Sequence, residues 1–162
     1  MSDRTLDRVD RQILDELQKD SSISTIELAE RVGLSQSPCW RRVQRLKDAG
    51  IIKKSVAILD RSKFGNLIHI YAHLRMKPIA SRERQKLLDE ICAMPEILEA
   101  YTVLGEMDIM LKIIAPSHEW YQDFVFEKLH KLPGVLDVKS IITLKELKFT
   151  TRLPYDLLSE QG

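Results

Sequence analysis

The chain has 162 residues, enough for one or two small domains, and its 44% hydrophobic and 30% charged residues are typical of a globular protein. The 25 Lys and Arg against 24 Asp and Glu give a net charge of +1, which argues against a nonspecific nucleic-acid coat but not against a specific binder. No apolar run approaches the roughly 20 residues of a membrane span, and the charged start has no signal-peptide core. We therefore expect a cytoplasmic protein without a membrane partner.

The first 50 residues carry the periodicity of three helices. Apolar residues recur every four positions along a first helix of about residues 7–19 (Val9, Ile13, Leu17). A capping box over residues 24–27 begins a short second helix, which Gly33 ends. A third helix is expected over residues 35–49, with Gly50 closing it. A short glycine-containing turn between the second and third helices is typical of a helix-turn-helix.

The third helix has two different faces. Cys39, Val43 and Leu46 fall on one side and predict its buried face. Between residues 35 and 54, six basic residues accompany a single acid, a net charge of +5 that suits a DNA-facing surface because phosphate neutralisation supplies much of the affinity. The DNA-binding residues predicted from this pattern are Gln36, Ser37, Trp40, Arg41, Arg42, Gln44, Arg45, Lys53 and Lys54.

The reach of these side chains separates their expected roles. Gln36, Ser37 and Arg41 are best placed for base edges, where Arg favours guanine and Gln favours adenine. Phosphates are the expected partners of the remaining basic residues (Arg42, Arg45, Lys53, Lys54). Trp40 has two interpretations, packing at the edge of the domain core, which is commoner for an aromatic residue, or contact with DNA.

The periodicity changes after Gly50. Residues 51–59 are expected as a short strand pair or an extended linker, and residues 60–66 as a turn-rich joint. The pattern then predicts strand, helix, strand, strand, helix and strand over residues 67–76, 81–94, 97–104, 109–115, 117–131 and 135–147. This β-α-β-β-α-β order is the ferredoxin-like arrangement, so the expected fold class is α+β. The expected division is a DNA-binding domain over 1–54, a linker over 55–66 and a ligand-binding and oligomerisation domain over 67–162.

The two cysteines, Cys39 and Cys92, fall on apolar helix faces in different domains. We expect both to be small buried hydrophobic residues in a reducing compartment, since two distant cysteines form neither a disulfide framework nor a metal site. No metal and no cofactor are therefore expected.

Motifs in both halves of the chain occur in a recognisable order. The first half contains Asp7-x-x-Asp10-Arg11-x-Ile13-Leu14, Val32-Gly33-Leu34-Ser35-x-Ser37-Pro38-Cys39 and Gly50-Ile51-Ile52, and the second contains Gly105-x-x-Asp108 and Leu132-Pro133-Gly134-Val135. In this combination the chain resembles the Lrp/AsnC family of feast/famine regulators. The resemblance implies a winged helix-turn-helix followed by an amino-acid-binding module. It also implies a homodimer formed through the sheets of two modules, and dimers in the family often assemble into tetramers or octamers.

The same resemblance places an effector site between subunits, near the Gly105-x-x-Asp108 turn. A zwitterionic amino acid needs a carboxylate for its ammonium group, which Asp108 can supply, and N–H donors for its own carboxylate. Backbone N–H groups of the turn can supply those donors, with Gly105 at positive φ. The alternative is a plain hairpin turn with a solvated aspartate. The expected effector residues are Leu104, Gly105, Glu106, Met107 and Asp108, together with Thr150 and Thr151 on a segment that in relatives approaches a neighbouring subunit's pocket.

The expected function is sequence-specific binding to double-stranded DNA, regulating amino-acid metabolism under the control of a small amino acid. An enzyme resembling siroheme decarboxylases is one alternative, because they share this fold. The four histidines (His69, His73, His118, His130) are accompanied by no carboxylate pair or nucleophile-base set, so we expect no catalytic residues. A nucleoid-organising protein with broad, ligand-independent DNA binding is the second alternative.

Overall fold

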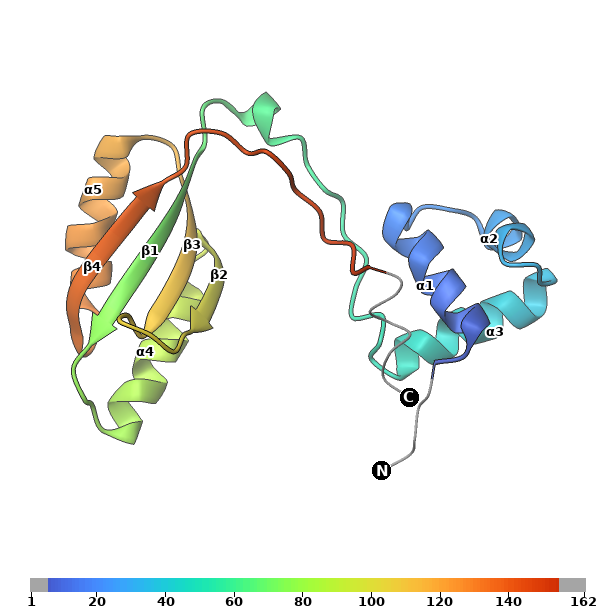
Figure 1. Ribbon diagram of the computed structural model, residues 1–162, viewed down its shortest axis with the longest axis horizontal. Helices are drawn as coiled ribbons and strands as arrows, with labels where there is room; N and C mark the ends of the chain where they lie inside the picture. The colour runs from blue at the N-terminus through green and yellow to red at the C-terminus, as the bar shows by residue number, and fades with distance from the viewer. Residues whose placement is uncertain (1–5, 155–162) are drawn as a thin grey trace. The chain divides into compact units, whose positions relative to one another are not determined.

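The computed structural model describes residues 6–154, which form two compact units (Figure 1). Within this range, residues 6–58 and 148–154 make up the first unit and residues 59–147 the second. The expected boundary assigned everything after residue 66 to the second domain. The tail groups with the first unit because it contacts the first helix, where Arg152 pairs with Asp15.

Three helices build the first unit. They are α1 (Arg8–Lys19), α2 (Thr25–Arg31) and α3 (Gln36–Asp48). Asp7 and Asp10 form a capping box at the start of α1, and the Ser24 side chain caps α2 by accepting from the Glu27 N–H. Gly33, at φ 68°, lets the chain leave α2 and reverse into α3. The three predicted helices are thus confirmed within a residue or two of their expected ends.

The core of the first unit lies between the three helices. Its buried apolar members are Ile13, Leu14, Leu28, Ala29, Val32, Cys39 and Leu46. Val43 is half-buried and packs against this cluster, so the predicted inner face of α3 is confirmed. Burial raises the pKa of the Cys39 thiol, which keeps the group neutral.

The segment after α3 is extended. Residues 53–60 belong to no helix or strand, and a single 3-10 turn, η1 (Arg61–Phe64), follows them. Of the two sequence-based interpretations, the extended linker is the one observed.

The second unit is a four-stranded antiparallel sheet with helices on one face (Figure 1). Its strands are β1 (Ile68–Met76), β2 (Ile97–Thr102), β3 (Ile109–Ala115) and β4 (Val135–Ile142). The helices are α4 (Ser81–Ala93), α5 (His118–Glu127) and the 3-10 turn η2 (Leu129–Lys131). The strand order β2-β3-β1-β4 with this connectivity confirms the ferredoxin-like prediction.

One face of the sheet supplies the second core. Alternate residues of β1 and β3, such as Ile70, Leu74 and Leu111, pack against Leu87 of α4 and Phe124 of α5.

The expectation that Cys92 is buried is wrong, because this residue is exposed. Leu87 and Ile91, four residues apart, form the narrow buried stripe of α4, and Cys92 lies one residue, about 100°, beyond it. No helix in residues 6–154 is long and apolar enough to span a membrane.

Candidate DNA-binding and effector sites

The outer face of α3 is open to solvent. Gln36, Ser37, Trp40 and Arg41 are exposed, and Gln44 is half-buried. The Arg41 side chain forms no ion pair or hydrogen bond with another residue in the described part of the chain. A guanidinium without an internal partner is free to bind a base edge or a phosphate.

Trp40 lies outside the core. It is 52% exposed, so about half of its surface is open to solvent. Contact with DNA and packing at the edge of the core both stay predictions for Trp40.

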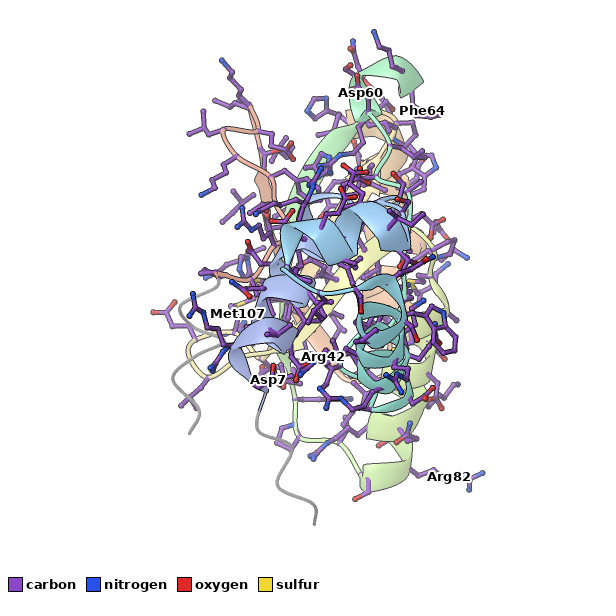
Figure 2. All side chains as sticks on the ribbon, turned by 90° about the vertical axis from the view of Figure 1, so that its right-hand side faces the viewer. Asp7, Arg42, Asp60, Phe64, Arg82 and Met107 are labelled. Atoms are coloured by element: carbon purple, nitrogen blue, oxygen red, sulfur yellow. The ribbon has the colours of Figure 1, made fainter. Side chains whose placement is uncertain are left out.

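Arg42 and Arg45 pair with two carboxylates at the start of α1. Figure 2 labels one of these pairs, Arg42 with Asp7. Arg42 Nη1 lies 2.5 Å from Asp7 Oδ2 and 2.8 Å from Asp10 Oδ1, and Arg45 Nη2 pairs with Asp10 Oδ2. Burial raises the pKa of Asp7, but the Asp10 N–H and the Arg42 guanidinium outweigh it and hold that pKa below its usual range. Sequence reasoning missed this cluster, although the Asp7-x-x-Asp10 spacing was visible.

Lys53 and Lys54 are exposed on the extended segment that follows α3. Neither forms an ion pair with a described residue. Their charges are thus accessible from solvent, and contact with phosphates stays a prediction.

In the second unit, residues 103–108 form the loop that joins β2 to β3. Asp108 fixes its end: the Asp108 C=O accepts from the Val103 N–H at 2.9 Å, and the Asp108 N–H donates to the Leu74 C=O at 2.9 Å. The Asp108 carboxylate accepts from the Met76 N–H at 2.7 Å. The loop is therefore tied to the end of β1 by main chain and side chain together.

The middle of this loop has unpaired donors. The backbone N–H groups of Leu104, Gly105, Glu106 and Met107 have no acceptor within residues 6–154. Leu104 is fully exposed, and Met107, labelled in Figure 2, is half-buried. Consecutive unpaired N–H groups in a loop can bind an anion such as a carboxylate.

The predicted backbone conformation of Gly105 is wrong. The glycines with positive φ are Gly33, Gly50, Gly65 and Gly134, and Gly105 is not among them. A Cβ at Gly105 would meet nothing within 4 Å. The chain reverses over six residues, 103–108, so no single position needs the left-handed conformation.

Thr150 and Thr151 are exposed on the tail and belong to the first unit. Thr150 Oγ1 accepts from the Arg152 N–H at 3.1 Å. Because the loop of residues 103–108 belongs to the second unit, the structure does not bring the two groups of predicted effector residues together within one unit.

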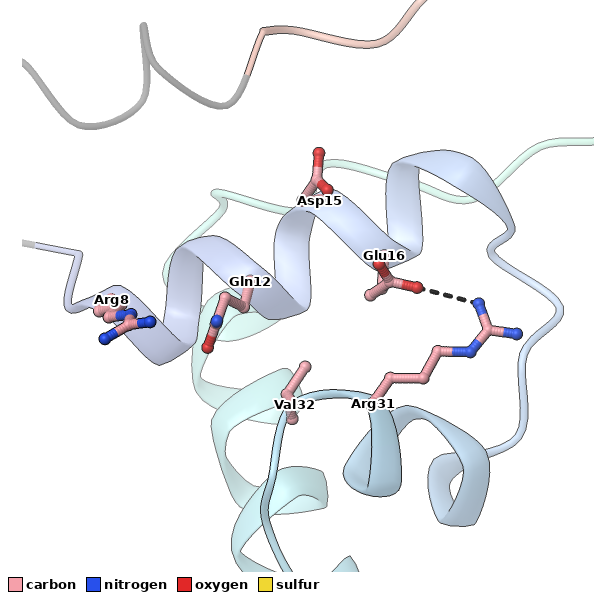
Figure 3. A pocket seen from close by; sticks show the side chains of 6 residues that line it. All are labelled: Arg8, Gln12, Asp15, Glu16, Arg31 and Val32. Carbon is pink, nitrogen blue, oxygen red and sulfur yellow. Dashed lines mark hydrogen bonds and ion pairs between the residues drawn. The ribbon is translucent and has the colours of Figure 1, made fainter.

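A shallow pocket between α1 and α2 was not predicted (Figure 3). Its lining consists of Arg8, Gln12, Asp15, Glu16, Arg31 and Val32. An ion pair crosses it, with Arg31 Nη1 at 2.9 Å from Glu16 Oε2. Its two arginines and two carboxylates are equal in number, so the lining has no excess charge of either sign.

The four histidines all lie in the second unit. No cluster of three or more His, Cys, Asp or Glu side chains arranged to hold a metal occurs among the residues described. His69 instead contacts Arg61, whose Nη1 donates to His69 Nε2 at 2.8 Å. Burial, with a further contribution from the Arg61 charge, lowers the pKa of His69.

Comparisons with known proteins define the class. Residues 6–53 match a winged helix-turn-helix DNA-binding family, and residues 69–153 match the Lrp/AsnC ligand binding domain. A DNA-binding module followed by a ligand-binding module is the organisation of a ligand-responsive transcription regulator. The chain belongs to the Lrp/AsnC family of transcription regulators.

The likeness to individual relatives spans both domains. The chain is 36% identical to the transcriptional regulator AzlB of Bacillus subtilis, covering 93% of this chain and 96% of that protein. It is 35% identical to the leucine-responsive regulatory protein of Escherichia coli, covering 93% and 92%. A crystal structure of an AsnC family regulator from Agrobacterium tumefaciens matches with a TM-score of 0.88 at 33% identity, covering 93% and 98%. A Neisseria meningitidis regulator solved as an L-Met complex matches with a TM-score of 0.89 at 34% identity, covering 95% and 99%.

Proposed function

We propose that this regulator reads specific DNA sites with α3 and changes its DNA binding when an amino acid occupies the second unit, thereby controlling genes of amino-acid metabolism. The observation that carries the proposal is the open outer face of α3, whose Arg41 has no internal partner in residues 6–154. The family match of residues 6–53 and 69–153 supports the pairing of DNA binding with ligand binding.

In this proposal the residues in the first turns of α3 contact the DNA bases. Gln36, Ser37 and Arg41 reach base edges in the major groove, with Trp40 and Gln44 beside them. Lys53 and Lys54 hold phosphates from the extended segment, and the exposed part of Arg45 remains available to do the same.

The effector is an amino acid bound at residues 104–108. The unpaired N–H groups of this loop suit its carboxylate, and the acidic side chain of Asp108 or Glu106 suits its ammonium group. The L-Met bound to the Neisseria meningitidis regulator supports an amino acid as the ligand class. In this proposal Thr150 and Thr151 of a neighbouring subunit complete the site, so that the ligand is held between copies.

A homodimer provides two copies of α3. On the sheet face that no helix covers, Tyr101 and Ile141 are 50% and 57% exposed, and this face is the proposed dimer surface (Figure 1). A twofold dimer implies pseudo-palindromic DNA with half-sites about one helical turn, or a multiple of it, apart. Tetramers or octamers would bind further half-sites on the same DNA, because the first contact raises the effective concentration of the remaining subunits.

The proposed role is that of a cytoplasmic regulator and not of an enzyme. Its matched relatives are transcription regulators, and their likeness covers the DNA-binding module as well as the second domain. An enzyme resembling siroheme decarboxylases would bind and convert a tetrapyrrole, which would change the absorbance spectrum of the tetrapyrrole. A nucleoid-organising protein would bind selected and random DNA with equal affinity.

The test is selection of duplexes from a random-sequence library by the full chain. Titrations would then compare the best selected duplex with a random duplex of equal length, with and without each of the twenty amino acids. We expect a selected-to-random affinity ratio of roughly 10³ or more and at least one amino acid that changes it. A ratio near unity, or indifference to every amino acid, would overturn the proposal.

A further inference from the structure

We infer that Asp10 is a positioning residue for DNA reading: its buried carboxylate sets the rotation of α3 about its own axis through Arg42 and Arg45. In this inference Arg42 binds carboxylates within the domain and does not bind a DNA phosphate. The inference rests on the proposed function, because it concerns how α3 presents its outer face to DNA.

The geometry converges on one carboxylate. Asp10 is 2% exposed and is the one buried charged residue in the described part of the chain. Its Oδ1 accepts from Arg42 Nη1 at 2.8 Å, and its Oδ2 accepts from Arg45 Nη2 and from the Asp7 N–H, the latter at 3.3 Å. Arg42 also reaches Asp7 Oδ2 at 2.5 Å. Four residues therefore join the start of α1 to the middle of α3.

The spacing of the two arginines makes the contact sensitive to rotation. Residues three apart lie on the same side of a helix, so Arg42 and Arg45 reach the same carboxylate only when that side faces α1. A rotation of about 100° would exchange Arg41 for Arg42 on this side and remove Arg41 from the outer face. A carboxylate hidden from water is costly without charged partners, so such rotated states are disfavoured.

The apolar contacts of α3 do not fix its rotation as closely. Cys39 and Leu46 are buried, but neighbouring apolar groups can slide past one another with little directional preference. The paired guanidinium and carboxylate groups have fixed hydrogen-bond directions. The ion-paired cluster thus adds a directional constraint to the orientation that the buried apolar face of α3 already favours.

Arg42 is poorly available to DNA. Its side chain is 29% exposed and is shared between two carboxylates, whereas Lys54 is exposed and unpaired within residues 6–154. A phosphate would have to replace both partners of Arg42 and would leave Asp10 without one of its two arginines.

The test separates phosphate contact from positioning by salt dependence. Affinities of the full chain for a duplex selected from a random library and for a random duplex of equal length would be measured over a series of KCl concentrations. Each lost phosphate contact reduces the slope of log affinity against log salt by about 0.9. Circular dichroism would establish the temperature range in which each variant stays folded.

We expect Arg42→Gln and Asp10→Asn to lower the selected-to-random affinity ratio at least fivefold while the salt slope stays as in wild type. The matched control, Lys54→Gln, should lower the slope by about 0.9 and leave the ratio unchanged. Arg42→Lys keeps a cation that a phosphate accepts but loses the planar fork that bridges Asp7 and Asp10. It should therefore lower the ratio as Arg42→Gln does, and it keeps the test decisive if Arg42→Gln unfolds.

The inference would be overturned if Arg42→Gln lowered the slope of log affinity against log salt by about 0.9 and left the selected-to-random affinity ratio unchanged. In that case Arg42→Lys would bind DNA as the wild type does. An unchanged ratio in a folded Asp10→Asn protein would overturn it as well. Failure of the proposed function is distinguishable from either result, because it appears as a ratio near unity in the wild-type protein.

Discussion

The Asp108 carboxylate accepts a hydrogen bond from the backbone N–H of Met76 at 2.7 Å. Met76 is the last residue of β1, at the point where the pairing of β1 with β4 shifts register. The side chain therefore holds the loop of residues 103–108 on the sheet in addition to carrying a negative charge. Its two properties, acceptor and charge, can be separated by substitution.

Asp108→Asn and Asp108→Ala should differ in their effects on the effector response. Asn keeps an oxygen for the Met76 N–H but loses the charge, whereas Ala loses both. If Asp108 binds the ammonium group, both variants should lose the thermal shift caused by the effector amino acid. If its role is to hold the loop, Asn should retain most of the shift and Ala little. A full shift in Asp108→Ala would exclude both roles.

Arg41→Ala should weaken specific DNA binding more than nonspecific binding. Loss of a bidentate contact with a base costs about 1–3 kcal/mol, or roughly 5- to 150-fold in the dissociation constant for the selected duplex. Lys54→Ala is the matched comparison and should weaken selected and random duplexes by similar factors. Fluorescence anisotropy at one fixed salt concentration measures both. Equal losses from the two substitutions would contradict the assignment of Arg41 to a base.

His69 should make the free energy of unfolding depend on pH. Burial and then the Arg61 charge lower its pKa below the ordinary value of 6.5, and Lys112 adds to this while Glu146 partly offsets it. Near pH 6.5 the unfolded chain therefore binds more protons than the folded one, so stability decreases as pH falls through this value. The loss levels off below the folded pKa.

His69→Gln should reduce that pH dependence. Urea denaturation at pH 7.5 and 5.5 and at one fixed protein concentration measures the difference in unfolding free energy, which should be smaller in the variant. His118→Gln, at an exposed position on α5, is the control and should keep the wild-type difference. If His69→Gln keeps the wild-type difference in unfolding free energy between the two pH values, His69 is not the cause of the pH dependence.

Gly134→Ala should destabilise the second unit, and should do so less in a protein that already carries Ile79→Ala. Gly134 has a positive φ of 80°, so the substitution costs about 1–2 kcal/mol for the backbone alone. A Cβ at Gly134 would lie 2.5 Å from Ile79 Cγ2, an atom that Ile79→Ala removes. The overpacking adds about 1–3 kcal/mol when Ile79 is present. Equal losses of stability from Gly134→Ala with and without Ile79→Ala, measured by urea denaturation, would mean that Ile79 moves aside at no cost.

The sequence predicted most elements because their apolar residues recur at helical or strand spacing. The buried Cys39 and Leu46 of α3 and the alternation along β1 follow from such periodicity. The inward arginine pair was not predictable in the same way, because it depends on how α1 packs against α3. Charge alone placed Arg42 and Arg45 with the DNA-facing residues, since a basic residue has the same local pattern whether its partner is a phosphate or Asp10.

Turn geometry was also harder to predict. A glycine followed by polar residues between two strands favours a tight turn with positive φ. The β2–β3 connection is instead six residues long, and its shape is set by the hydrogen bonds of Asp108 to Leu74 and Met76 on another strand. Sequence spacing locates such a loop but carries no information on the strand that holds it.

The first unit contains two separate stretches of the chain. The end of the second stretch contacts α1, where Arg152 donates to Asp15 and the Gln18 side-chain amide exchanges hydrogen bonds with the backbone of Leu153. During synthesis the three helices are made first, yet this side of α1 stays uncovered until the entire second unit has been translated. The DNA-binding unit therefore completes its contacts only after the ligand-binding unit exists. A fragment made of residues 1–58 alone corresponds to the incomplete state that the ribosome produces first.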